Sequence, residues 1–171
     1  MIIKEKLVAA INGQVRNEFA ASNQYVAIAV YFDEEGLPDL AGFFYRQAEE
    51  ERMHAMKFVH FLLETGGRPV IPGLPDARNT FESAADAVQY ALGQEIKVTS
   101  QINDLVSLAR AEQDIISDNF MQWFVNEQIE EVNTMTNLLQ TIKHAGSNLL
   151  WVEDYVRRNA AAAADAAGTA A

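Results

Sequence analysis

The amino-acid sequence predicts an all-α protein, a bundle of four long helices with one long crossover connection between the second and third, followed by a short fifth helix. Two observations lead to this fold. Glycine and proline divide the chain into four apolar-periodic segments of roughly 28 residues, each about 40 Å long as a helix. One connection, GGRPVIPGLPDARNTF, holds three of the four prolines and cannot be helical.

Each predicted helix is bounded by residues that start or stop helices. The first ends around Glu35-Gly36, and the second begins at Pro38 because proline is tolerated in a first turn. The second ends at Gly66-Gly67, and Gly146 ends the fourth. The segment NLLWVEDYVRR predicts the fifth. The predicted helices span residues 4–34, 38–65, 82–110, 114–144 and about 147–158.

The lengths of the connections predict the topology. The first and third are short, so the helices they join pack antiparallel. The second, about 16 residues in extended form, can cover ~50 Å and traverse the whole bundle, so the second and third helices run parallel. One domain, residues 1–158, contains all five helices. The Ala-rich end, residues 159–171, is low in complexity and has no amphipathic face, so we assign it no function.

Composition excludes several classes of function. The net charge of −11 argues against binding to nucleic acid or anionic membranes and favours a cationic partner or cargo. The chain has no cysteine, which excludes disulfides and thiolate-ligated metal sites. The charged start, MIIKEKLVAAINGQ, has no signal-peptide core, and no apolar run approaches a membrane span. We therefore expect a cytoplasmic protein.

Carboxylates interrupt the apolar stripe of every long helix near its middle. Glu18, Glu51, Glu95 and Glu131 hold these positions, and the midpoints of helices joined in this way lie at similar height. We therefore expect the four to converge on one small volume, with two further polar residues beside them, His54 and Gln128. Mutually repelling carboxylates in a dry core require cations. Oxygen-rich coordination with one imidazole suits iron or manganese and is poor for structural zinc.

Simpler explanations apply to each residue taken alone. A single buried Glu or His is more often a satisfied polar group than a ligand, and the triplet Glu49-Glu50-Glu51 alone would be a solvated face. One E-x-x-H motif arises by chance in many helices. Four such positions at matching heights on four helices favour the metal site.

With these residues in place, the sequence resembles the ferritin family, specifically the haem-free ferritins of bacteria and archaea, over roughly residues 4–158. The resemblance implies a first iron site at Glu18, Glu51 and His54, with Glu51 bridging to a second site at Glu95, Gln128 and Glu131. It also implies a third, weaker iron site, which would comprise Glu50, Glu127 and Glu130. Tyr25 matches a tyrosine beside the two irons, and Trp123 matches a nearby tryptophan. Ordinary core packing would also explain both aromatic residues.

Departures from related families narrow the resemblance. Bacterioferritins repeat E-x-x-H on the fourth helix, where this chain has Gln128-Ile129-Glu130-Glu131 without histidine. Their haem-binding methionine directly follows the second-helix glutamate, where this chain has Arg52; Met53 is rotated by about 100° around the helix. We therefore expect no haem. Rubrerythrins need cysteine, and the small DNA-protecting relatives use a site between subunits and lack the fifth helix.

The resemblance implies a ferroxidase that oxidises Fe(II) with O₂ or hydrogen peroxide and deposits Fe(III) as mineral inside a homo-oligomeric shell, expected to have 24 subunits with the fifth helix at the four-fold axes. Asp118 falls near the family's three-fold channel, where it would attract Fe(II); we favour the alternative of a helix N-terminal acid that interacts with the macrodipole. The open alternatives are a diiron oxidase or oxygenase acting on an organic substrate, a non-catalytic iron buffer and a purely structural bundle.

Overall fold

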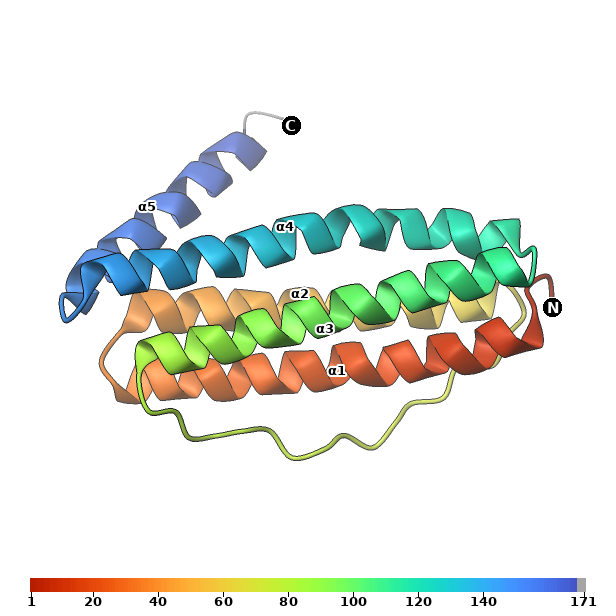
Figure 1. Ribbon diagram of the computed structural model, residues 1–171, viewed down its shortest axis with the longest axis horizontal. Coiled ribbons are helices and arrows are strands. Elements are labelled where there is room, and N and C mark those ends of the chain that lie inside the picture. The colour runs from red at the N-terminus through yellow and green to blue at the C-terminus, as the bar shows by residue number, and fades with distance from the viewer. Residues whose placement is uncertain (169–171) are drawn as a thin grey trace.

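The computed structural model, which describes the backbone of residues 1–168 and the side chains of residues 1–162, is all-α (Figure 1). The first four predicted helices are confirmed with ends shifted by only a few residues. Within the described residues no helix has the length and apolarity needed to cross a membrane. The helices are α1 (Glu5–Glu34), α2 (Pro38–Glu64), α3 (Ala84–Ala111), α4 (Ile115–Ala145) and α5 (Leu149–Gly168).

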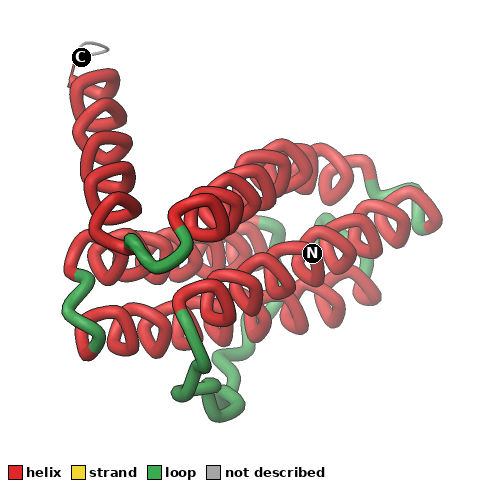
Figure 2. The backbone as a smooth tube through the Cα atoms, turned by 60° about the vertical axis from the view of Figure 1, so that its left-hand side comes forward, coloured by secondary structure: helices red, strands yellow, loops and turns green. Residues whose placement is uncertain are grey.

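The predicted crossover topology is confirmed. α1 and α2 form one antiparallel pair and α3 and α4 another, and the extended segment after α2 runs the length of the bundle so that α3 starts at the same end as α2 (Figures 1 and 2). The side-chain amides of two α1 residues hold this segment in place. Asn12 donates to the carbonyl of Arg68 and accepts from the amide of Val70, at 3.0 and 2.7 Å. Gln24 makes the same paired contact with the backbone of Arg78, at 2.9 and 2.8 Å.

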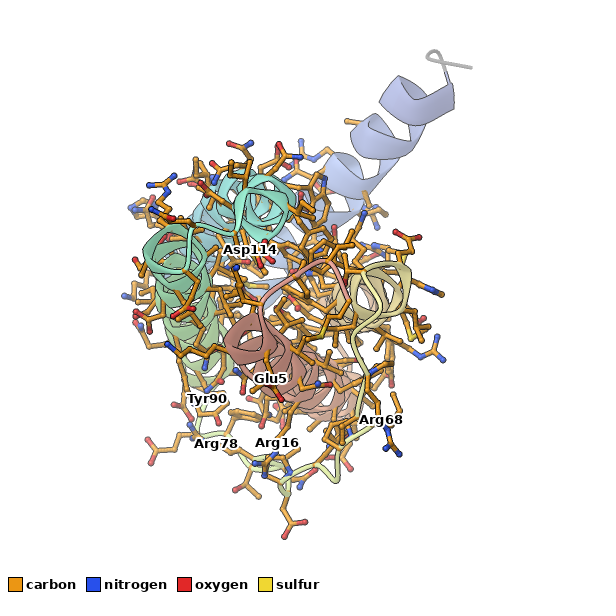
Figure 3. The ribbon with its side chains drawn as sticks, turned by 90° about the vertical axis from the view of Figure 1, so that its right-hand side faces the viewer. Glu5, Arg16, Arg68, Arg78, Tyr90 and Asp114 are labelled. Carbon is orange, nitrogen blue, oxygen red and sulfur yellow. The ribbon has the colours of Figure 1, made fainter. Side chains whose placement is uncertain are left out.

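These two attachments set the path of the crossover along α1. Figure 3 views the bundle along its axis and shows Arg68 and Arg78 on the α1 side, with Arg16 of α1 between them. An asparagine or glutamine side chain carries both a donor group and an acceptor group, as a strand edge does, so it can hold an extended segment without a sheet. The proline-rich segment therefore has a fixed route past the middle of the bundle.

The core is divided into two apolar clusters by a polar layer. The cluster at the α5 end contains Phe32 and Phe44, and the cluster at the N-terminal end contains Phe58 and Phe124. Each of α1 to α4 contributes to both clusters and passes from one to the other at a buried glutamate. This arrangement explains the stripes read from the sequence, apolar at both ends and acidic in the middle. The four glutamates are Glu18, Glu51, Glu95 and Glu131.

The fifth helix differs from its predicted extent. We expected residues 147–158, but α5 continues to Gly168, so the Ala-rich segment is helical through most of its length. Alanine has the highest intrinsic helix propensity. Once a helix has been nucleated, a run of alanines can prolong it even though that run has no amphipathic face. Figure 1 shows α5 projecting away from the bundle. Residues 169–171 of the predicted tail lie outside the described residues.

A carboxylate of α5 caps the start of α2. Leu37, the N-cap residue, has no side chain that can accept a hydrogen bond, and Pro38 has no N–H. Glu153 supplies the missing acceptors, since its two carboxylate oxygens accept from the backbone amides of Asp39 and Leu40 at 2.8 and 2.7 Å. Glu153 is itself buried, with 6% of its surface exposed. The base of α5 is therefore fixed to the bundle by charge-assisted hydrogen bonds.

Replacing Glu153 with alanine should destabilise the protein by about 1.5–3 kcal/mol, because a buried and a partly buried amide at the α2 N-terminus would lose a charged acceptor. The measurement is the shift of the thermal unfolding midpoint. Asp154→Ala is the matched control: the side chain of Asp154 is 40% exposed, and among the side chains that the structure describes it pairs only with Arg157 and Arg158. The control should change stability by less than about 0.5 kcal/mol. Equal shifts in the two variants would contradict the capping role.

Candidate metal centre

The central carboxylate cluster, defined as Glu18, Glu51, Glu95 and Glu131 with His54 and Gln128, lies between the two apolar clusters. All four long helices contribute to it, and each of its six side chains is exposed by 5% or less. The structure therefore brings together all six residues that the sequence analysis placed here.

Glu51 belongs to two groups of possible metal ligands. One oxygen or nitrogen atom from each of Glu18, Glu51 and His54 lies within 4.8 Å of the others, and the same holds for Glu51, Glu95 and Glu131. The Nδ1 atom of His54 is 3.3 Å from a Glu51 oxygen, as expected for side chains one turn apart. A carboxylate has two oxygens, so Glu51 can offer a ligand atom to both groups.

A third group lies next to the first two and differs from the predicted one. Ligand atoms of Glu50, His54, Glu127 and Glu131 lie within 4.8 Å of one another. The Nε2 atom of His54 faces Glu127 at 3.9 Å. Glu130, which we expected here, lies outside the group. Its side chain is exposed, because it lies about 100° around α4 from Glu131, which faces the cluster. Burial is the main cause of the raised pKa values of Glu50 and Glu131, and the charge of Glu130 makes a smaller contribution in the same direction.

Burial and mutual repulsion raise the pKa values of these carboxyl groups and so favour their neutral, protonated forms. Burial, and then the nearby Glu95, raises the pKa of Glu131 to about 9. Burial likewise raises the pKa of Glu18 and of Glu51 well above the ordinary value, and neighbouring carboxylates add to the effect. One oxygen of Glu18 is buried without a hydrogen-bond partner. A bound cation would satisfy that oxygen and reverse the preference for the neutral forms.

Uncharged polar side chains hold the carboxylates in position. Gln14 donates to one oxygen of Glu18 at 2.8 Å and leaves the other free. Tyr25 donates its hydroxyl to Glu95, and the amide of Gln128 lies 3.2 Å from the second oxygen of Glu95. Gln14 was not among the residues predicted to take part in the cluster. Its position one turn before Glu18 was the signal that could have identified it.

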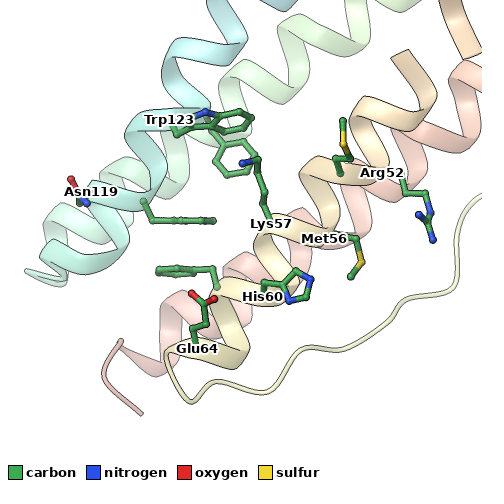
Figure 4. A pocket seen from close by; sticks show the side chains of 11 residues that line it. Arg52, Met56, Lys57, His60, Glu64, Asn119 and Trp123 are labelled. Carbon is green, nitrogen blue, oxygen red and sulfur yellow. The ribbon is translucent and has the colours of Figure 1, made fainter. Parts of the chain in front are cut away.

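Of the remaining predicted residues, Trp123 lies at the edge of the cluster and Asp118 lies at the start of α4. The indole ring of Trp123 meets the His54 ring edge to face at 5.4 Å, and the ammonium of Lys57 lies 4.1 Å above the indole. Trp123 also lines a surface cavity of about 730 Å³ between α2 and α4 (Figure 4). Asp118 lies in the first turn of α4 and accepts from Arg110 and Gln122, at 3.2 and 2.9 Å, which agrees with the helix N-terminal role that we favoured.

Four long helices with one crossover and glutamates projecting inward from each define the carboxylate-bridged metal proteins of the bundle class. The model of the ferritin family, described as a ferritin-like domain, matches residues 8–145. The chain therefore belongs to the ferritin family, whose members store iron and oxidise Fe(II).

Curated relatives agree with this assignment. The chain is 50% identical to ferritin BfrB of Mycolicibacterium smegmatis over 158 residues, covering 92% of this chain and 87% of that protein. It is 48% identical over 165 residues to BfrB of Mycobacterium tuberculosis, which is named both ferritin and bacterioferritin, with 96% and 91% covered. It is 30% identical to a bacterial non-heme ferritin of Staphylococcus epidermidis over 147 residues, with 86% and 89% covered.

A solved structure supports the fold. An open-pore ferritin of Archaeoglobus fulgidus superposes with a TM-score of 0.88 at 32% sequence identity, covering 90% of this chain and 97% of that one. The fold, the family model and the buried cluster of glutamates and histidine therefore agree on a ferritin.

Proposed function

We propose that this ferritin binds two Fe(II) ions at the central carboxylate cluster, oxidises them and stores the Fe(III) product as a mineral. The observation that carries the proposal is the position of Glu51, whose carboxylate belongs to two ligand groups at once. Glu18, Glu51 and His54 would hold one ion. Glu51, Glu95 and Glu131 would hold the other, with Gln128 beside it. Iron is the substrate here, and it leaves the cluster after oxidation.

The side chains favour oxidation by stabilising the higher charge. Carboxylates are hard anionic ligands and stabilise Fe(III) more than Fe(II). Each Fe(II) loses one electron, and one O₂ takes both electrons with two protons to become hydrogen peroxide. Hydrogen peroxide can serve as the oxidant instead, and it takes two electrons with two protons to become two waters. The single imidazole and the neutral Gln128 limit the negative charge at the cluster, so that Fe(III) is released. The hydrogen bond from the Tyr25 hydroxyl fixes the orientation of the Glu95 carboxylate.

Glu50, Glu127 and Glu130 would form the outgoing path for Fe(III). Glu50 and Glu127 share a group of ligand atoms with His54 and Glu131, which connects them directly to the cluster. Glu130 is exposed and would act at the outer end of the path. The mineral requires an enclosed volume, for which we propose a cytoplasmic shell of 24 copies of this chain. Arg52 at the position of the haem-binding methionine supports a haem-free protein.

The test is an aerobic pulse of Fe(II) into the metal-free protein, followed by ferric absorbance and by the iron that co-elutes with the protein. Oxidation far faster than in buffer, with hundreds of irons retained per particle, is the expected result for a storage ferroxidase. Rapid oxidation of about two irons per chain without retention would instead identify an oxidase of another purpose. Binding without acceleration would identify an iron buffer.

A further inference from the structure

An apolar groove between α3 and α4 leads to the central carboxylate cluster from the side away from α2. Its volume is about 350 Å³, and its apolar lining comes from Ile102 on α3 and Val125, Ile129 and Val132 on α4. The other lining residues are amides and a hydroxyl, and none of the described residues that line it is charged. In a chain of net charge −11, an uncharged approach to a cluster of carboxylates selects against cations.

Gln128 connects the groove to the cluster. Its side chain lines the groove and is only 4% exposed, and its amide nitrogen lies 3.2 Å from an oxygen of Glu95. The same nitrogen lies 3.2 Å from the hydroxyl of Thr99, which also lines the groove. The inner end of the groove is therefore one side chain away from a proposed iron ligand.

The α2–α4 side of the cluster has the opposite character. Glu50 of α2 and Glu127 of α4 lie there next to His54. A hydrated divalent cation loses much of its water on passing an apolar lining, at a cost of several kcal/mol, whereas carboxylates replace that water. An apolar diatomic molecule has the reverse preference.

We infer that dioxygen reaches the metal cluster through the α3–α4 groove, with Gln128 and Thr99 at its inner end, while iron travels on the carboxylate side. This inference rests on the proposed function, because it assigns a route to one of the two substrates of that reaction. Separate routes let iron and dioxygen reach the cluster without competing for one path.

The first experiment narrows the groove and measures how the oxidation rate depends on dioxygen concentration. Val132→Phe should raise the apparent KM for dioxygen by about fivefold or more while the rate at saturating dioxygen and the anaerobic Fe(II) binding stoichiometry stay unchanged. Met56→Phe is the matched control, since Met56 lines the cavity between α2 and α4 and not the groove. An unchanged KM in Val132→Phe, or an equal rise in Met56→Phe, would overturn the inference.

The second experiment does not depend on activity. Xenon, an apolar probe of similar size to dioxygen, should bind in the groove of the metal-free protein under pressure and should be displaced in Val132→Phe, as seen by crystallography. The milder Val132→Leu should weaken binding if the phenylalanine variant does not fold. Absence of xenon from the wild-type groove would overturn the inference. Failure of the wild type to oxidise Fe(II) would instead overturn the proposed function and leave the xenon result to decide the groove.

Discussion

Glu51→Ala should abolish rapid Fe(II) oxidation and lower the initial rate by about 100-fold or more, the largest effect expected of any single substitution in this chain. Glu51 is the residue common to both ligand groups, so its loss removes an oxygen from each proposed iron and separates the two ions. Stopped-flow absorbance after a Fe(II) pulse measures the rate. Anaerobic titration should show that the stoichiometry of tight Fe(II) binding also falls.

The neighbouring triplet provides a control of the same residue type on the same helix. Glu49 is exposed and belongs to none of the ligand groups of the described residues, so Glu49→Ala should oxidise Fe(II) at the wild-type rate. A wild-type rate in Glu51→Ala, or an equal loss in the two variants, would show that the buried cluster is not the site of oxidation.

The metal-free protein should become less stable as the pH rises from about 5 to 9. Burial raises the pKa of Glu131 to about 9 from an ordinary value of 4.5, so the folded state keeps a proton that the unfolded state has released. The folded state therefore binds more protons throughout this window. The stabilisation from this bound proton is complete below the pKa that Glu131 has in the unfolded state. It is lost as the pH rises through the pKa that Glu131 has in the folded state. Each carboxyl that stays protonated contributes up to about 1.4 kcal/mol per pH unit.

Thermal unfolding midpoints across this pH range measure the effect. Glu131→Gln should show a shallower decline, because an amide cannot titrate and holds the same volume. Saturating Mn(II) should reverse the slope of the wild type, since the metal displaces the protons and binds more tightly as the pH rises. A metal-free protein that gains stability with pH over this window would contradict the neutral state of the cluster.

The fold was predictable because its determinants are local. Glycine and proline mark the end of α1, both ends of α2 and the end of α4, whereas α3 begins at the cap Ser83 and α4 at the cap Asp114. The length of the one proline-rich connection requires the second and third helices to run parallel. The position of α5 depends instead on a contact between Glu153 and amides more than a hundred residues earlier, which no local pattern reveals. Its length was misjudged because the absence of an amphipathic face was given more weight than the helix propensity of alanine.

The cluster was predictable for a related reason. Glutamates at the middle of four stripes must meet when the helices are joined in this order. Of the residues expected in the third site, Glu50 and Glu127 share a ligand group with His54 and Glu131, and Glu130 lies outside that group. The contacts of Gln14 with Glu18 and of Thr99 with Gln128 were not predicted. An uncharged polar residue can be buried at a much lower cost than a carboxylate, so its presence in an apolar stripe does not by itself indicate a site.

The division of the core into two clusters affects how the sequence can diverge. Substitutions that share no packing partners have additive effects on stability, whereas those within one packed cluster are coupled. The polar layer separates Phe32 and Phe44 from Phe58 and Phe124. A destabilising substitution in one cluster is therefore compensated by a second substitution at the same end of the bundle. Related chains can therefore exchange the packing of one end as a unit and retain the other, while the chemistry between them constrains a single narrow layer of residues.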